Sequence, residues 1–95
     1  MIPINISEEA IAEIKNIMTH KNIPTDYGLR LGVKGGGCSG MSFMLGFDKK
    51  KETDDSFEVD GVVVYVEKKH VMYLLSKKVV FYDDAEARGF AFEDE

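Results

Sequence analysis

Apolar residues in the first quarter of the chain recur at the spacing of one helix face. They are Ala10, Ile11, Ile14, Ile17 and Met18. Intervals of three and four residues place such side chains on a single stripe of an α-helix. Ser7 stands at the position of an N-cap, and the two acidic residues after it suit a first helical turn. The pattern predicts an amphipathic helix over about residues 8–21, which Pro24 ends.

From Gly28 onward the apolar positions alternate with a period of two, as in a half-buried strand. The first series is Leu29, Leu31 and Val33, and the second is Met41, Phe43, Leu45 and Phe47. A glycine-rich break at residues 35–40 separates the two series. Two strands that are joined by a short loop predict an antiparallel pair.

The next segment predicts a loop and then a hairpin. Residues 48–56 are polar and predict a surface loop, after which a third strand begins at Phe57. The dipeptide Asp60-Gly61 is typical of a hairpin turn, because glycine accepts a positive φ. The unbroken β-branched and aromatic run Val62–Val66 predicts a strand that is buried on both faces.

The last part of the chain predicts one short helix and two more strands. Val71, Leu74 and Leu75 share a helical face, so a short helix is expected within residues 67–75. The strands are expected at Val79–Tyr82 and Gly89–Phe92. With no repeat or linker, residues 1–95 predict a single α+β domain, mostly antiparallel, with the helices on one side of the sheet.

Composition narrows the class of protein. No apolar stretch approaches the length of about 18 residues that a transmembrane helix needs, and the start of the chain has no basic n-region. We therefore expect neither a membrane partner nor a secretory signal. The single cysteine excludes an internal disulfide framework and fits a reducing cytoplasm.

The net charge of −5 is concentrated at the C-terminus, because residues 1–81 carry 11 acidic and 11 basic residues. Nucleic-acid binding requires clustered Lys and Arg, so nucleic acid is not expected as a partner. The short run Lys49-Lys50-Lys51 is followed at once by acidic residues and is interpreted as a solvated turn.

The segment with candidate chemistry is Gly35-Gly36-Gly37-Cys38-Ser39-Gly40. Its spelling matches G-x-G-x-x-G, but a dinucleotide site requires a helix after the motif, and here a strand is predicted. Glycines permit close backbone approach, and backbone N–H groups that point at a sulfur atom favour thiolate over thiol. Cys38 is therefore a candidate metal ligand. A tight turn with an incidental thiol is the alternative.

One thiolate does not complete a metal site, because iron–sulfur clusters and structural zinc take four donors. The missing donors would come from another subunit, from exogenous thiols or from a further segment. A lone ligand also needs a symmetry mate, which predicts a homodimer or a higher oligomer. A redox-sensing role of the Cys38 thiol is a weaker hypothesis.

Four motifs together resemble the HesB/IscA-like family of A-type iron–sulfur cluster assembly proteins. They are Gly28–Val33, Gly36-Gly37-Cys38-Ser39-Gly40-Met41, Phe43-x-Leu45-x-Phe47 and Gly89-Phe90-x-Phe92. The similarity extends over about residues 4–92, in the family's order. It implies a HesB-like, β-rich domain that forms dimers or tetramers, binds iron or an iron–sulfur cluster, and passes it to apo-proteins together with other assembly proteins.

The resemblance also assigns roles to single residues. Cys38 matches the first of the family's three cysteines, with Gly36, Gly37, Ser39 and Gly40 as the loop around it. After Phe92 the family continues with Asn-Pro and a C-G-C motif, whereas this sequence reads Glu93-Asp94-Glu95. An alternative function is therefore a HesB-like interaction or structural module that has lost cluster binding.

Other candidate residues favour structural roles. His70 has Lys68 and Lys69 beside it, which indicates an exposed face, and His20 suits the end of the first helix as a cation. The carboxylates of residues 93–95 could bind iron, but a solvated terminus is the preferred interpretation. Met41, Met44 and Met72 are expected in core or interface packing. Ser39 has no His and Asp partners in a triad pattern, and we predict no enzyme.

Overall fold

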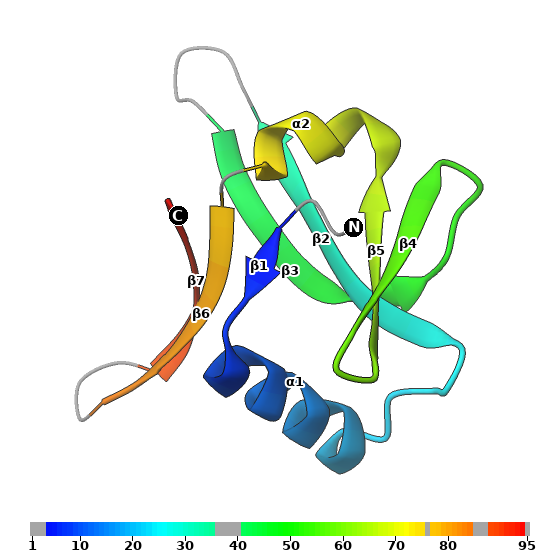
Figure 1. The fold of residues 1–95 in the computed structure, drawn as a ribbon. Coiled ribbons are helices and arrows are strands. Elements are labelled where there is room, and N and C mark those ends of the chain that lie inside the picture. The colour runs from blue at the N-terminus through cyan, green and yellow to red at the C-terminus, as the bar shows by residue number, and fades with distance from the viewer. Residues whose placement is uncertain (1–3, 36–40, 76, 85–87, 95) are drawn as a thin grey trace.

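The structure, a computed structural model, describes residues 4–35, 41–75, 77–84 and 88–94. In chain order the elements are β1 (Asn5–Ile6), α1 (Glu8–His20), β2 (Tyr27–Gly35), β3 (Met41–Lys49), β4 (Asp54–Val59), β5 (Val62–Glu67), the 3₁₀ turn η2 (Lys68–His70), α2 (Val71–Leu74), β6 (Lys77–Asp83) and β7 (Arg88–Asp94). The strands form a three-stranded sheet, β1-β6-β7, and a four-stranded sheet, β3-β2-β5-β4 (Figure 1). The predicted α+β fold is confirmed.

Pairing within the sheets is mixed but mostly antiparallel. The hairpins β2–β3, β4–β5 and β6–β7 are antiparallel. The pairs β1–β6 and β2–β5 are parallel, and neither of them was predicted. Parallel neighbours need a long crossover, so residues far apart in the chain form these two pairs.

Helix α1 begins and ends within one residue of the prediction. The Ser7 side chain accepts a hydrogen bond from the backbone N–H of Ala10 at 3.1 Å, as an N-cap does. The backbone N–H of Lys21 donates to the carbonyl of Ile17 at 2.9 Å and closes the last turn. Ala10, Ile11 and Ile14 are the buried residues of α1, which confirms the amphipathic pattern.

The predicted loop over residues 48–56 is too long at both ends. Strand β3 continues to Lys49, and β4 already begins at Asp54, which pairs with Glu67 of β5. The polar start of β4 is compatible with a strand because the Asp54 side chain is buried against Arg30. Polarity alone therefore misplaced this boundary.

The Asp60-Gly61 turn is confirmed, since both residues have positive φ values of 50° and 86°. The expectation that the run after it is buried on both faces is wrong. Along β5, Val62, Val64 and Val66 are buried, whereas Val63 and Tyr65 are only half-buried. The four-stranded sheet turns one face to the core, so β5 alternates as other half-buried strands do.

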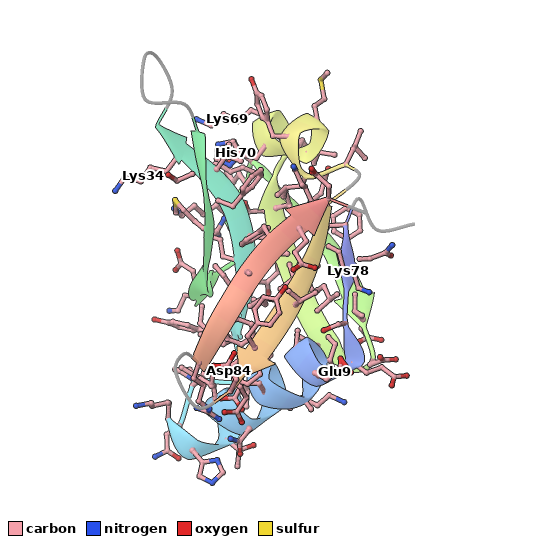
Figure 2. All side chains as sticks on the ribbon, turned by 90° about the vertical axis from the view of Figure 1, so that its left-hand side faces the viewer. Glu9, Lys34, Lys69, His70, Lys78 and Asp84 are labelled. Atoms are coloured by element: carbon pink, nitrogen blue, oxygen red, sulfur yellow. The ribbon has the colours of Figure 1, made fainter. Side chains whose placement is uncertain are left out.

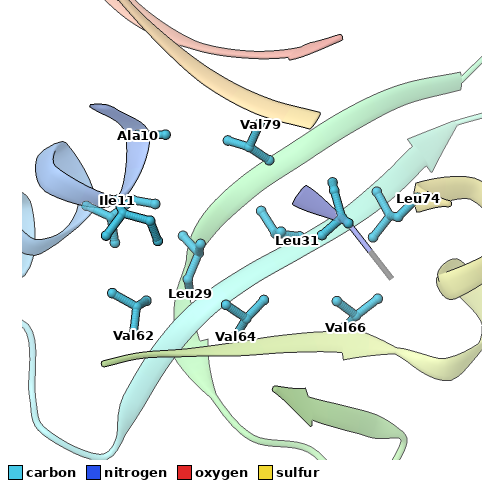
Figure 3. Close-up of a cluster of buried hydrophobic side chains, with 11 residues drawn as sticks. Ala10, Ile11, Leu29, Leu31, Val62, Val64, Val66, Leu74 and Val79 are labelled. Atoms are coloured by element: carbon cyan, nitrogen blue, oxygen red, sulfur yellow. The ribbon is translucent and has the colours of Figure 1, made fainter. Parts of the chain in front are cut away.

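One hydrophobic core lies between the sheets and the helices (Figure 3). Its buried members are Ile4, Ala10, Ile11, Ile14, Leu29, Leu31, Val62, Val64, Val66, Leu74 and Val79. Both helices contribute to this core on the inner face of the four-stranded sheet, as predicted, although they stand at opposite ends of it (Figure 1). Among the described residues, no helix has the length and apolarity to span a membrane.

Candidate functional site

The predicted ligand Cys38 lies outside the described residues, as do Gly36, Gly37, Ser39 and Gly40. What the structure defines is the place where this segment begins and ends. Gly35 is the last residue of β2, Met41 is the first residue of β3, and the two are direct partners in the antiparallel register. Residues 36–40 therefore connect two adjacent strand ends, and no helix follows the motif, as the rejection of a dinucleotide site requires.

Several other segments start or end at this same end of the molecule, which we call the loop end (Figure 1). Because β5 is parallel to β2, with Leu31 paired to Val66, both strands leave the sheet in the same direction. The turn η2 and helix α2 follow β5 directly. Helix α2 thus lies next to the strand ends that hold residues 36–40.

The last strand also ends near β3. The rings of Phe43 and Phe92 are stacked, with centroids 5.1 Å apart, and the Lys77 ammonium lies 5.2 Å from the Phe43 centroid. Lys77 further forms an ion pair with Asp94. These contacts bring the end of β7 to the beginning of β3, two residues after Met41.

The acidic candidates at the C-terminus therefore have different surroundings. Asp94 is already paired with Lys77, and Glu93 is exposed and stands opposite Lys78 in the register. Glu95 lies outside the described residues. Within the part of the chain that the structure describes, no group of three or more His, Cys, Asp or Glu side chains could hold a metal ion.

His70 lies at the loop end, and its surroundings correct the prediction. Lys68 and Lys69 are exposed, but His70 itself is half-buried. Its ring packs against the backbone of Gly32, where a Cβ atom would stand 3.0 Å from Nδ1. A glycine in β2 thus leaves room for the imidazole. His20, by contrast, is exposed, and its Nδ1 lies 2.8 Å from the Asn16 carbonyl oxygen, near the end of α1.

The methionines are more exposed than core packing allows. Met44 on β3 has 41% of its surface exposed, and Met72 on α2 has 80% exposed. The core alternative is therefore wrong for both residues, and interface packing stays a prediction. The predicted helical face is also wrong at Leu75, which is 51% exposed, because α2 ends at Leu74 and the backbone of Leu75 is extended.

A buried ion pair on the outer face of β2 is the clearest feature that the sequence analysis missed. The Nη1 and Nη2 atoms of Arg30 donate hydrogen bonds to the Asp54 carboxylate at 2.8 and 2.6 Å. The same carboxylate accepts from the backbone N–H of Lys51 at 2.7 Å. Arg30 also donates to the Lys49 carbonyl and lies 3.4 Å from the Asp48 carboxylate. These bonds fix the connection between β3 and β4.

This ion pair shifts the pKa values of both side chains toward their charged forms. The hydrogen bonds from Arg30 hold the pKa of the Asp54 carboxyl below its ordinary value, against desolvation, which acts in the other direction. The bond to Asp54 likewise raises the pKa of Arg30. The sequence alone did not show the pairing, because the partners are 24 residues apart.

Comparison with known proteins identifies the family to which this chain is similar. The chain matches the family model described as iron–sulphur cluster biosynthesis over residues 2–95. An iron-binding protein IscA of Photorhabdus laumondii is 36% identical over 92 residues, which cover 96% of this chain and 84% of that protein. An iron–sulfur cluster insertion protein ErpA of Xylella fastidiosa is 31% identical over 93 residues, or 97% of this chain and 72% of that protein.

Solved structures agree with these matches. The crystal structure of Escherichia coli SufA, which is involved in biosynthesis of iron–sulfur clusters, gives a TM-score of 0.80 at 25% identity, covering 96% of this chain and 79% of SufA. A crystal structure of IscA with a [2Fe–2S] cluster shares the fold with a TM-score of 0.73 at 18% identity, over 96% of this chain and 81% of that chain.

The fold is that of SufA and IscA. The chain belongs to the iron–sulphur cluster biosynthesis family, which confirms the resemblance found in the sequence.

Proposed function

We propose that this protein is an A-type carrier that binds iron or an iron–sulfur cluster through Cys38 and passes it to apo-proteins. The observation that carries the proposal is the family match over residues 2–95, which includes the glycine-loop cysteine. Relatives named as an iron-binding protein and as a cluster insertion protein support the same cargo. The paired strand ends Gly35 and Met41 support a fixed base for the loop.

In this proposal the loop serves the thiolate. Gly36, Gly37 and Gly40 allow the backbone to approach the sulfur atom closely, and their N–H groups, with Ser39, stabilise its negative charge. The 95 residues contain one cysteine, so a homodimer supplies two thiolates. The remaining donors come from exogenous thiols, from a partner protein or from a further segment.

Anaerobic loading with ferrous iron and sulfide tests this function. We expect the wild-type protein to bind iron and to develop the visible absorption of a thiolate-bound cluster, and Cys38→Ser to bind none. Ser56→Ala is the matched control, because Ser56 is an exposed residue of β4 and carries no proposed ligand. A colourless wild-type protein whose iron content equals that of Cys38→Ser would refute the proposal.

One observation favours a second candidate, an interaction module that has lost cluster binding. Asp94, an alternative oxygen donor, is already paired with Lys77. In this case Cys38→Ala leaves the binding of partner proteins intact. A pull-down with both proteins distinguishes the two candidates when it is combined with the iron measurement.

The remaining parts of the proposal follow from the carrier role. The partners are apo iron–sulfur proteins and other cluster assembly proteins, and the compartment is the reducing cytoplasm, where a thiolate persists. We propose no catalytic residue, because a carrier holds and releases its cargo by ligand exchange.

A further inference from the structure

Large apolar side chains gather on the outside of helix α2. Met72, Tyr73 and Leu75 expose 80%, 47% and 51% of their surface. They are three of the five large hydrophobic residues that are exposed in the described part of the chain. We call them, together with Lys68 and Lys69 of η2, the α2 surface. Contiguous exposed apolar residues on a small domain mark an interaction site more often than scattered ones do.

Packing on the other side of the helix explains this exposure. Leu74 is fully buried, and Val71, three residues earlier, packs against the core. Since residues three apart share one face of a helix, Met72 and Tyr73, which lie between them, point outward. Leu75 follows the helix with an extended backbone and is exposed there. The fold therefore uses one side of α2 as an anchor and leaves the other side without a contact in the core.

The backbone of this segment is held at both ends. The N–H of Lys68 donates to the Thr53 carbonyl at 2.9 Å, and the N–H of Leu75 donates to the Val71 carbonyl at 3.2 Å. Because the backbone is fixed before any partner arrives, little conformational entropy is lost there on binding. Methionine and tyrosine side chains are enriched in protein interfaces.

The chain segment that carries the α2 surface is basic. From Lys68 to Tyr82 the sequence contains four lysines and no acidic residue. The rest of the chain then carries 8 basic and 17 acidic residues, a net charge of −9, since the total is 12 and 17. Lys69 and Lys77 pair with Glu67 and Asp94, respectively.

Lys68 and Lys78 form no ion pair with any described residue. Figure 2 shows Lys34 and Lys69 in the half of the molecule with the loop end, whereas Glu9 and Asp84 lie at the opposite end. The surface around the apolar residues therefore attracts an acidic partner.

We propose that the α2 surface is the docking site for an acidic segment of an apo iron–sulfur protein, in which carboxylates flank apolar side chains. This inference rests on the proposed carrier function and adds where, and by what chemistry, the recipient is held. The position fits the role, because η2 and α2 follow β5 at the loop end, beside the strand ends that flank residues 36–40.

A second copy of this chain does not fit the same surface as well. A two-fold symmetric contact would place the lysines of one α2 surface near those of the other, which is unfavourable. A head-to-tail contact with the acidic end of the next copy would build rings or open chains rather than the expected two-fold dimer. A lipid surface rich in phosphatidylserine is the other anionic target, and the experiment below separates it.

The test uses the ¹⁵N-labelled, iron-free protein and the apo form of an acidic [2Fe–2S] ferredoxin as the probe. We expect amide shifts within residues 68–78 and binding that weakens as salt is added. Tyr73→Ser is expected to raise the Kd about thirtyfold, as the loss of a central aromatic residue does. Lys68→Glu is expected to raise it about tenfold, mainly through slower association.

Two variants serve as matched controls. Tyr82 is 46% exposed, nearly as much as Tyr73 at 47%, but it lies near the far end of β6. Lys50 is an exposed lysine that follows the far end of β3. Tyr82→Ser and Lys50→Glu are expected to change the Kd by less than about twofold.

Four results would overturn the docking proposal. They are no binding of the ferredoxin, shifts outside residues 68–78, equal losses in the control variants, and sedimentation with phosphatidylserine vesicles that Lys68→Glu abolishes while ferredoxin binding is unchanged. The carrier function is scored separately by iron content. A wild-type protein that loads iron but does not bind the ferredoxin refutes only the docking site, and one that binds the ferredoxin but never loads iron refutes only the carrier role.

Discussion

Two regions of the molecule depart from the usual distribution of polar and apolar residues, in opposite directions. At the Arg30–Asp54 pair a carboxylate side chain has 0% of its surface exposed. At the α2 surface a methionine has 80% of its surface exposed. Charged residues are rarely fully buried without a partner, and contiguous apolar residues are rarely left outside.

The difference between the regions is where the compensating contacts are. The Asp54 carboxylate has its partners within the chain, namely two guanidinium N–H groups of Arg30 and the backbone N–H of Lys51. Met72, Tyr73 and Leu75 have no comparable cover in the core. The first region is therefore explained by folding, whereas the second is explained by binding. Four predictions test this distinction.

Removal of one partner of the buried pair is expected to have the largest effect. Asp54→Ala leaves the Arg30 guanidinium, only 14% exposed, without its carboxylate. We expect the free energy of unfolding to fall by about 3–5 kcal/mol, measured by urea denaturation. In the double variant Arg30→Met, Asp54→Leu, no charge is left unpaired, and most of the loss should be recovered. If Asp54→Ala has the stability of the wild type, the pair does not support the fold.

Glycines of the four-stranded sheet provide a second test of tight internal contact. A Cβ atom at Gly28 would lie 2.7 Å from the Tyr65 ring and 2.8 Å from the Val63 carbonyl oxygen, whereas at Gly46 nothing lies within 4 Å. Gly28→Ala should therefore lower the free energy of unfolding by about 1–3 kcal/mol. Gly46→Ala should change it by no more than about 0.5 kcal/mol. Equal effects in urea denaturation would contradict this packing.

Acid should weaken the first region specifically. The pKa of Asp54 is lower in the folded than in the unfolded protein, so its contribution is complete above the unfolded value of about 3.9. It is lost as the pH falls from there through the lower folded-state pKa. Urea midpoints between about pH 6 and pH 3 should fall more steeply for the wild type than for the double variant Arg30→Met, Asp54→Leu. Parallel curves would exclude this source of acid sensitivity.

The smallest expected effect is on the stability of the second region. Met72→Ser should change the free energy of unfolding by no more than about 0.5 kcal/mol, because the side chain is mostly in water. Its buried neighbour provides the contrast, since Leu74→Ala should cost about 2–5 kcal/mol. Thermal denaturation of both variants measures the change in the free energy of unfolding. A large loss in Met72→Ser would show that α2 needs this side chain for folding.

Elements whose hydrophobic pattern repeats over many residues could be predicted from the sequence. Helix α1 and the β2–β3 hairpin match their predicted positions closely, because each repeats its pattern over several turns or pairs. The two-residue strand β1 is too short to show any period. The burial of Asp54 was also not predictable, because it depends on Arg30, a residue distant in the chain.

The candidate site was predictable only in part. Its position between two antiparallel strands followed from alternation on both sides of the glycines, and the register of Gly35 with Met41 confirms it. The arrival of η2 and α2 at the same end was not predictable, because it depends on the parallel pairing of β2 with β5. The sequence also did not predict which side of α2 is exposed, since all residues from Val71 to Leu75 are apolar.

The short strand β1 has a consequence for the order in which the fold forms. Asn5 pairs with Lys78, a residue far along the chain, so β1 joins its sheet only once β6 is in place. Pairing over such a sequence separation slows folding. We therefore expect the β2–β3 hairpin, whose strands are joined by a short connection, to form before the three-stranded sheet closes.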